Sequence, residues 1–408
     1  MKHTHIIMAA TAALLTSLAP ANAWAQSWLK AGPYLQELSA DGVTVVFENN
    51  IKSFSWVEVR EQGTSAATKY FDERDGQHQI YSQTVAPQVA APLQNFTVRL
   101  DGLTKATTYE YRVCTREVNW LRPYSASVGD IHEGDWHTFT TFDPQATEHH
   151  LVVVSDMHHR PEVLQQTLEA LNYQSAEHII YAGDMMDNMQ LTANTVKEPE
   201  EPYASFINKS VELFATKQDF IPLRGECETR GDIARHFRDY FPHQSGRLYN
   251  AYRWGDLMVV TLDGGESAAD GNPLARTSNL GAFAQYRAQE ARWLAQVVAS
   301  EDYRTAKYRI VISHFPVTNE VLDEAEAGAA QFARLMLPVL NEAQVDLMVA
   351  GHRHPDSHTM IGKGSKGNNF PILVQGYSMG ARIDIVQGNI TVTTAGKNVK
   401  ATTEKLSK

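Results

Sequence analysis

The sequence predicts two folded units in series, an N-terminal all-β sandwich over residues 28–142 and an α/β domain over residues 148–400. In the first unit, apolar and polar residues alternate in short runs that turn residues separate, which is typical of antiparallel strands. In the second unit, continuous apolar runs alternate with helical segments, which is typical of a layered α/β domain. A chain of 408 residues is long enough for two or three domains.

The composition is that of a soluble globular protein, with 43% hydrophobic and 20% charged residues, and it excludes a disordered chain. A formal net charge of −11 argues against binding a nucleic-acid duplex. It leaves a small phosphorylated substrate open, because bound metal ions can reverse the local field. The two cysteines, Cys114 and Cys227, are too few for a disulfide framework.

Residues 1–25 have the pattern of a secretory signal peptide. Lys2 precedes an apolar run over 6–18, and small residues then offer a cleavage site after Ala23 or Ala25. We therefore expect an exported protein, periplasmic or secreted. No later segment is long and apolar enough to predict a membrane span.

The sandwich is predicted from alternating apolar positions in three segments. These positions are Val43, Val45 and Phe47, then Phe96, Val98 and Leu100, then Tyr109, Tyr111 and Val113. Asp41-Gly42 and Asp101-Gly102 supply turns between such runs. A linker is expected at 142–145, and His149 and His150 are expected to be solvated linker residues.

The α/β domain is predicted to contain three helices. Pro161 suits the first helical position, and the apolar spacing that follows predicts a buried helix face. That face comprises Val163, Leu164, Leu168 and Leu171. Two further helices are expected near 283–298 and 331–340.

Five apolar runs of the second unit each end in Asp, Glu or His. They lead into Asp156 and His158, into Asp184 and Asp187, into Glu226, into His314, and into His352 and His354. Because ligands of open α/β sheets bind beyond the carboxyl ends of the strands, we expect these side chains to converge. Imidazole and carboxylate together suit Mn, Fe or Zn. A single apolar run that ends in one of these residues is weak support for a metal site, whereas five such runs in order are not expected by accident.

This ordered set of motifs resembles the calcineurin-like metallophosphoesterase superfamily over residues 148–390. The segment Gly32-Pro33-Tyr34-Leu35-Gln36 and the strands around 100–113 extend the similarity to the N-terminal fibronectin type III domain of purple acid phosphatases. The resemblance implies two packed mixed sheets flanked by helices. It also implies an acid phosphatase-like hydrolase that cleaves phosphate esters with a metal-bound hydroxide.

The resemblance further implies two divalent or trivalent metal ions, with Mn, Fe and Zn all open as their identity. The implied ligands of the first ion are Asp156, His158, Asp184 and His354. Asp184 would bridge to the second ion, whose remaining ligands would be Glu226, His314 and His352.

The chain departs from the family pattern at three positions. Asp187 stands where purple acid phosphatases have the tyrosine that binds ferric iron, so no purple colour is expected. Glu226 replaces an asparagine; it can still ligate, but it adds a third carboxylate and makes the centre less positive. Cys227 replaces a histidine that approaches the leaving group, often oriented by an aspartate at the position of Asp187.

Loss of such a general acid typically costs about 10²–10⁴ in rate. Three roles stay open for Cys227: a weak acid, a thiolate ligand, or a small residue that fills the gap. His159 is a candidate substitute acid, with a side chain that points to the opposite face of the strand end as the alternative. Arg230 is favoured for binding phosphate ahead of Arg160, Arg224 and Arg353, and a surface salt bridge is its alternative role. The sequence thus predicts a phosphoesterase of reduced or altered activity, with an inactive metal- or phosphate-binding pseudoenzyme as the alternative.

Overall fold

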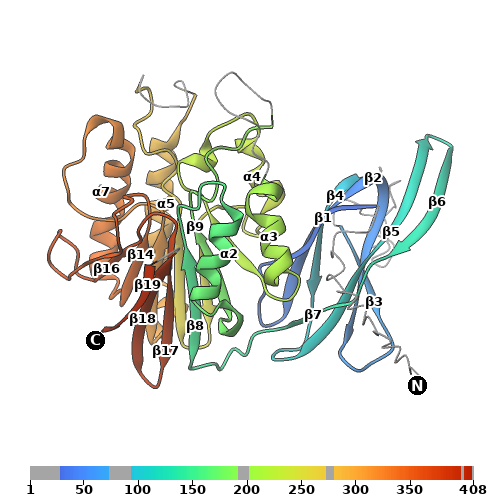
Figure 1. Ribbon diagram of the computed structural model, residues 1–408, viewed down its shortest axis with the longest axis horizontal. Coiled ribbons are helices and arrows are strands. Elements are labelled where there is room, and N and C mark those ends of the chain that lie inside the picture. The colour runs from blue at the N-terminus through green and yellow to red at the C-terminus, as the bar shows by residue number, and fades with distance from the viewer. Residues whose placement is uncertain (1–27, 73–92, 192–201, 273–279, 397–398, 407–408) are drawn as a thin grey trace, which may run out of the picture.

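The computed structural model describes residues 28–72, 93–191, 202–272, 280–396 and 399–406. The expected signal peptide, 1–25, lies outside the described residues. Figure 1 shows a strand-only unit on the right, which contains the N-terminal part of the chain, and a larger unit of sheets and helices on the left.

The N-terminal unit is rich in strands, as the alternating pattern predicted. Its strands are β1 (Leu29–Gln36), β2 (Gly42–Glu61), β3 (Thr68–Phe71), β4 (Leu93–Asp101), β5 (Thr108–Arg122), β6 (Ser125–Glu133) and β7 (His137–Thr140). The first half of β2 pairs with β1 and β4, and its second half pairs with β3 and β5. Apolar side chains such as Val45, Phe96 and Tyr111 are buried in a common core, which is consistent with a β-sandwich.

The larger unit contains two mixed sheets of six strands each. In order across the first sheet, the strands are β10 (Phe220–Leu223), β9 (His178–Ala182), β8 (His149–Val154), β17 (Met379–Val386), β18 (Asn389–Gly396) and β19 (Val399–Leu406). The second sheet contains β11 (Asn250–Trp254), β12 (Leu257–Leu262), β13 (Tyr308–Ser313), β14 (Leu347–Ala350), β16 (Ile372–Val374) and β15 (Thr359–Ile361). Val153 and Ile180 of the first sheet share one buried cluster with Val259 and Ile310 of the second. The expected pair of packed mixed sheets is therefore confirmed.

Helices cover the outer faces of both sheets (Figure 1). The α-helices are α2 (Pro161–Ala170), α3 (Asn208–Ser210), α4 (Phe237–Tyr240), α5 (Phe283–Ala299), α6 (Glu301–Thr305) and α7 (Ala327–Glu342). The shorter or irregular turns are η2 (Tyr173–Ser175), η3 (Tyr203–Ile207), η4 (Val211–Ala215), η5 (Cys227–Thr229), η6 (Ala234–His236) and η7 (Glu324–Glu326).

The three predicted helices are present. Pro161 begins α2, whose buried residues include Val163, Leu164 and Leu168. Helices α5 and α7 cover the other two predicted segments, and each extends a little beyond them. Both pack with the second sheet around a cluster that contains Leu294 and Phe332. Among the described helices, none has the length and apolar character that crossing a bilayer requires.

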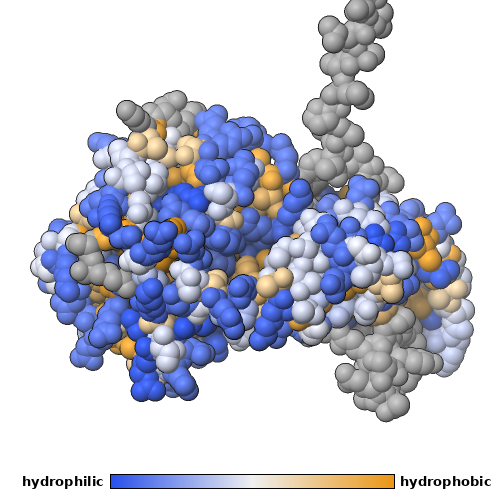
Figure 2. All heavy atoms as spheres, turned by 90° about the horizontal axis from the view of Figure 1, so that it is seen from below, coloured by the Kyte–Doolittle hydropathy of each residue, from blue (hydrophilic) through white to orange (hydrophobic). Residues whose placement is uncertain are grey.

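The two units are joined by hydrogen bonds between buried or partly buried groups. The Tyr34 hydroxyl donates to the Tyr240 carbonyl at 2.6 Å, and the Tyr111 hydroxyl donates to the Thr216 carbonyl at 2.9 Å. The Leu38 N–H donates to Asp219 Oδ2 at 3.0 Å. Figure 2 shows the two lobes meeting in a continuous, mostly hydrophilic surface.

The prediction that His149 and His150 are solvated linker residues is wrong. Both belong to β8, and His149 is only 2% exposed. Its Nε2 lies 2.8 Å from Asp256 Oδ1, and His150 Nδ1 lies 2.6 Å from Asp384 Oδ1. Polar residues at the start of a strand are taken into the sheet here because carboxylates from other elements satisfy their ring nitrogens.

Candidate metal centre

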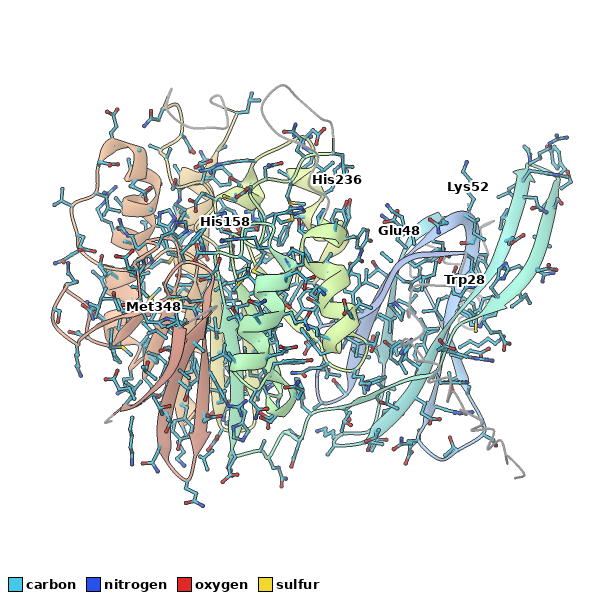
Figure 3. All side chains as sticks on the ribbon, viewed as in Figure 1. Trp28, Glu48, Lys52, His158, His236 and Met348 are labelled. Carbon is cyan, nitrogen blue, oxygen red and sulfur yellow. The ribbon has the colours of Figure 1, made fainter. Side chains whose placement is uncertain are left out.

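The predicted ligands all follow the carboxyl ends of strands of the two packed sheets. Asp156 and His158 follow β8, Asp184 follows β9, Glu226 follows β10, His314 follows β13, and His352 and His354 follow β14. Figure 3 shows His158 near the upper ends of β8 and β9. Parallel pairing of β8 with β9 and of β13 with β14 brings the strand ends together.

One cluster contains Asp156, His158 and His354, whose ligand atoms all lie within 4.8 Å of one another. His354 Nε2 is 2.9 Å from Asp156 Oδ1, and His158 Nε2 is 3.4 Å from His354 Nε2. Two imidazole nitrogens and a carboxylate oxygen thus point at the same small volume. These are three of the four residues expected to hold the first ion, the fourth being Asp184.

A second cluster contains Glu226, His314 and His352. Glu226 Oε2 is 3.0 Å from His314 Nε2 and 3.1 Å from His352 Nδ1. Although these three atoms are buried and close, none of them has a hydrogen-bond partner within the described residues. Buried polar atoms without partners are costly, and a shared cation would satisfy all three. The residues present therefore fit a bound metal ion.

Asp184 lies between the two clusters. Its Oδ2 is 3.9 Å from His158 Nε2 and 3.5 Å from His314 Nε2. Its Oδ1 accepts the Cys227 N–H at 3.0 Å, which fixes the carboxylate in place. Asp184 also belongs to a fully buried group with Asp156 and His314. Its position allows one carboxylate to serve both clusters.

Three of the histidines are oriented through the ring nitrogen that faces away from the site. His158 Nδ1 lies 2.8 Å from Asp187 Oδ1, His314 Nδ1 lies 2.9 Å from the Ala182 carbonyl, and His352 Nε2 lies 2.7 Å from Glu326 Oε2. Such partners fix the tautomer and direct the remaining nitrogen toward a metal. Asp187, expected beside residue 227, thus contacts His158.

The backbone at these positions is unusual. Asp156, His158, Asp184, His352 and His354 all have positive φ angles, between 46° and 69°. For residues other than glycine this conformation costs energy, and it is typically kept at functional sites. A Cβ at Gly225 would clash with Asp184 Oδ1, and one at Gly351 would clash with Asp156 Oδ2. Glycine is therefore required where the motifs approach these two carboxylates.

The electrostatics of the second cluster are consistent with a cation site. Burial opposes ionisation of Glu226, yet the imidazoles of His314 and His352 hold the pKa of its carboxyl well below the usual value. Burial also opposes the charge on His352, but Glu226 and Glu326 raise the pKa of that imidazole to about 9. Without a metal ion, protons on the imidazoles supply the positive charge that the carboxylates demand.

Cys227 is buried, and its Sγ lies within the same 4.8 Å limit of ligand atoms from His158 and Asp184. Burial raises the pKa of the Cys227 thiol, and the neighbouring carboxylates Asp184 and Glu228 raise it further. The thiol therefore holds its proton tightly without a metal. Its placement is compatible with either a filler or a ligand.

Glu228, two residues after Glu226, has a structural role that the sequence did not indicate. Its carboxylate accepts the backbone N–H groups of Asp184, Met186 and Gly225 at 2.8–3.1 Å. It thereby ties the turn that carries Asp184 to the turn that carries Glu226. Burial, then the charge of Asp184, raises the pKa of Glu228 to about 8 despite these donors.

Arg230 and His159, the other two predicted site residues, do not join the ligand clusters. Arg230 forms a two-pronged pair with Glu266, at 2.9 and 2.6 Å, and its Nη1 lies 3.8 Å from Cys227 Sγ. His159 Nδ1 lies 2.5 Å from Ser205 Oγ, and His159 is in none of the ligand groups found among the described residues.

The family model for calcineurin-like phosphoesterase matches residues 149–356. The chain belongs to this family. Among curated proteins, no sequence matches the chain.

Two solved structures illustrate the similarity. Purple acid phosphatase PPD1 from seeds of yellow lupin, Lupinus luteus, matches with a TM-score of 0.61 at 13% identity, covering 91% of this chain and 73% of that one. TT1561 of Thermus thermophilus matches with a TM-score of 0.40 at 15% identity, covering 61% and 99%. At this identity the similarity to the lupin protein supports the fold alone.

Proposed function

We propose that this chain is a metal-dependent phosphoesterase that hydrolyses phosphate esters at a dinuclear centre. The observation that carries the proposal is the pair of ligand clusters on either side of Asp184, one of which contains three buried ligand atoms that face one another without a hydrogen bond within the described residues. The nitrogen and oxygen donors suit Mn, Fe or Zn. When bound, two such ions would supply an activated water and a clamp for the phosphoryl oxygens.

The chain's own residues hold and orient this centre. Asp187 and Glu326 fix the rings of His158 and His352, and Glu228 fixes the turns that present Asp184 and Glu226. Glu226 adds negative charge where the family has a neutral amide, which weakens the attraction of the centre for a phosphate. We therefore expect lower turnover than a centre with asparagine would give.

Proton transfer to the leaving group is the second point at which this site should differ. The position of the imidazole acid is taken by Cys227, whose thiol retains its proton because burial and carboxylates raise its pKa. A group with such a pKa donates poorly near neutral pH. Esters whose leaving group needs little protonation should therefore be favoured.

The competing proposal is a pseudoenzyme that binds metal or phosphate without turnover. The replacements at Glu226 and Cys227 favour it, whereas the complete remaining ligand set favours catalysis. Metal binding alone does not separate the two proposals, but turnover does.

Hydrolysis of p-nitrophenyl phosphate and its bis ester by the Mn²⁺-loaded protein tests the proposal. Asp184→Asn, prepared identically, is the control for contaminating phosphatases, and Glu226→Asn/Cys227→His restores the family's third motif. Turnover by the wild type above the control supports the enzyme. Turnover by the double variant alone supports the pseudoenzyme, and no turnover by either contradicts the placement of the site.

We also propose that residues 1–25 direct export and that the strand-rich unit is a fibronectin type III-like module. The small residues that precede Gln26 support the first proposal, and the β-strand pairing supports the second. N-terminal sequencing of the protein from its native host tests export. A mature chain that begins at Trp24 or Gln26 is expected, and one that begins at Met1 would contradict it.

A further inference from the structure

A cleft of about 750 Å³ opens directly beside the first ligand cluster. His158, His354 and Asp187 form its metal-facing wall, and Arg160 and Tyr377 are among the residues on the other sides. Because His354 is itself partly exposed, a substrate bound at the centre can extend into this space.

Tyr377 presents an exposed aromatic ring at this cleft. The side chain is 46% exposed, and its ring centroid is 5.3 Å from that of His158 and 4.7 Å from that of His354. The loop that carries it is fixed to the metal site, because the Ser378 hydroxyl donates to the Asp156 carbonyl at 3.0 Å. An exposed aromatic ring held in place at a ligand cluster is a ready surface for stacking.

Arg160 lies over this ring, with its guanidinium carbon 4.2 Å from the ring centroid. Its Nε donates to the Met157 carbonyl at 2.9 Å and its Nη2 to the Asp156 carbonyl at 3.4 Å, so both known partners are neutral. Arg224 and Arg230, by contrast, are paired with the buried carboxylates of Asp263 and Glu266. Of these three arginines, Arg160 is the one whose charge no described carboxylate neutralises by an ion pair.

We propose that Tyr377 and Arg160 form a leaving-group subsite that selects phosphate esters whose alcohol carries a planar aromatic ring. The ring would stack on Tyr377, while the remaining N–H groups of Arg160 would attract the phosphate. Aryl esters and nucleoside phosphates share this chemistry. The inference rests on the proposed phosphoesterase function and names its substrate class.

The cysteine at position 227 is a second argument for an aromatic leaving group. An aromatic alcohol such as a phenol leaves with less help from an acid than an alkyl alcohol does. A site with Cys227 in place of an imidazole acid therefore gains most from aryl esters, and this second argument does not extend to nucleoside phosphates, whose leaving group is an alkyl alcohol.

The direct test is binding of two inert phosphonates to the Mn²⁺-loaded protein, measured by calorimetry. Benzylphosphonate and cyclohexylmethylphosphonate have similar size and charge, and only the first has an aromatic ring. Stacking of this kind is expected to give the wild type a preference of about fivefold to tenfold for benzylphosphonate. Tyr377→Leu should lose that preference, Tyr377→Phe should keep it, and Arg160→Gln should weaken both ligands.

Tyr124→Leu is the matched control, because Tyr124 is fully exposed on the β5–β6 hairpin of the other unit. Turnover of benzyl and cyclohexylmethyl phosphate, and of AMP and ribose 5-phosphate, then distinguishes a simple benzylic leaving group from a nucleoside. A preference for the aromatic member of either pair supports the subsite.

Two outcomes would overturn the inference, and they are distinguishable. If the wild type hydrolyses phosphate esters but binds the two phosphonates equally, with no effect of Tyr377→Leu, the subsite is wrong and the proposed function stands. If the protein hydrolyses no ester and binds neither phosphonate, the proposed function fails together with the subsite.

Discussion

Removal of Glu326 should weaken one of the two metal-binding steps without disturbing the fold. Glu326 Oε2 lies 2.7 Å from His352 Nε2, and the opposite nitrogen of that ring faces Glu226 at 3.1 Å. In Glu326→Ala the imidazole loses the partner that sets its tautomer and orientation. A ring that is free to rotate, or that carries its proton on the wrong nitrogen, is a poorer ligand.

The expected loss of metal affinity depends on how exposed the Glu326–His352 pair is. Loss of a partner of this kind typically costs about 10-fold to 100-fold in metal affinity. The Glu326 side chain is 25% exposed, so water can replace part of the lost hydrogen bond. We therefore expect the lower end, about 10-fold, which corresponds to about 1.4 kcal/mol.

Titration with Mn²⁺, with the free ion followed by electron paramagnetic resonance, measures the two binding steps. Asp187→Ala is the matched variant, since it removes the same kind of partner from His158 of the other cluster. Each single variant should weaken one step, and the double variant should weaken both. Unchanged affinity in Glu326→Ala would refute the role of this carboxylate, as would an equal loss at both steps in each single variant.

Three other predictions concern stability and are tested by urea unfolding. Burial raises the pKa of Asp219 to about 7, and a carboxyl with a raised pKa destabilises the fold increasingly as pH rises from about 4 to 7. Asp219→Asn should therefore be more stable than the wild type by at most about 4 kcal/mol at pH 8 and by less at pH 5. A stability difference that does not change with pH would contradict this. The same reasoning applies to Glu228, since burial and the charge of Asp184 raise its pKa to about 8. In EDTA, the stability of Glu228→Gln relative to the wild type should increase as pH rises from about 5 to 9, and a difference that stays constant over this range would argue against the raised pKa. Chelation of metal from the wild type should lower stability by about 2.7 kcal/mol for each site previously held at 100 times its dissociation constant, whereas an EDTA-insensitive midpoint would argue against bound metal.

The convergence of the candidate ligands could be predicted because it depends on local sequence and a simple topological rule. Each ligand follows an apolar run, and parallel strands place such ends at one edge of a sheet. The helix that begins at Pro161 was likewise predictable, since the proline and the apolar spacing are both local signals.

The supporting residues could not be predicted, because their roles depend on contacts between distant parts of the chain. Glu326 lies in an acidic stretch with no motif, and only the fold brings it to His352. The sequence made Arg230 a reasonable candidate for phosphate binding, but in the fold Glu266, 36 positions later, pairs with its guanidinium. Tyr377 gave no signal either, since a single tyrosine in a loop has no periodic pattern.

The central claim is that the two clusters around Asp184 hold two metal ions, and counting the ions tests it most directly. The wild type, loaded with Mn²⁺ and freed of excess metal by gel filtration, is analysed by inductively coupled plasma mass spectrometry beside Asp184→Asn. We predict about two ions per chain for the wild type and fewer for the variant, because the shared carboxylate serves both clusters. A wild-type protein that retains one ion or none would contradict the dinuclear centre.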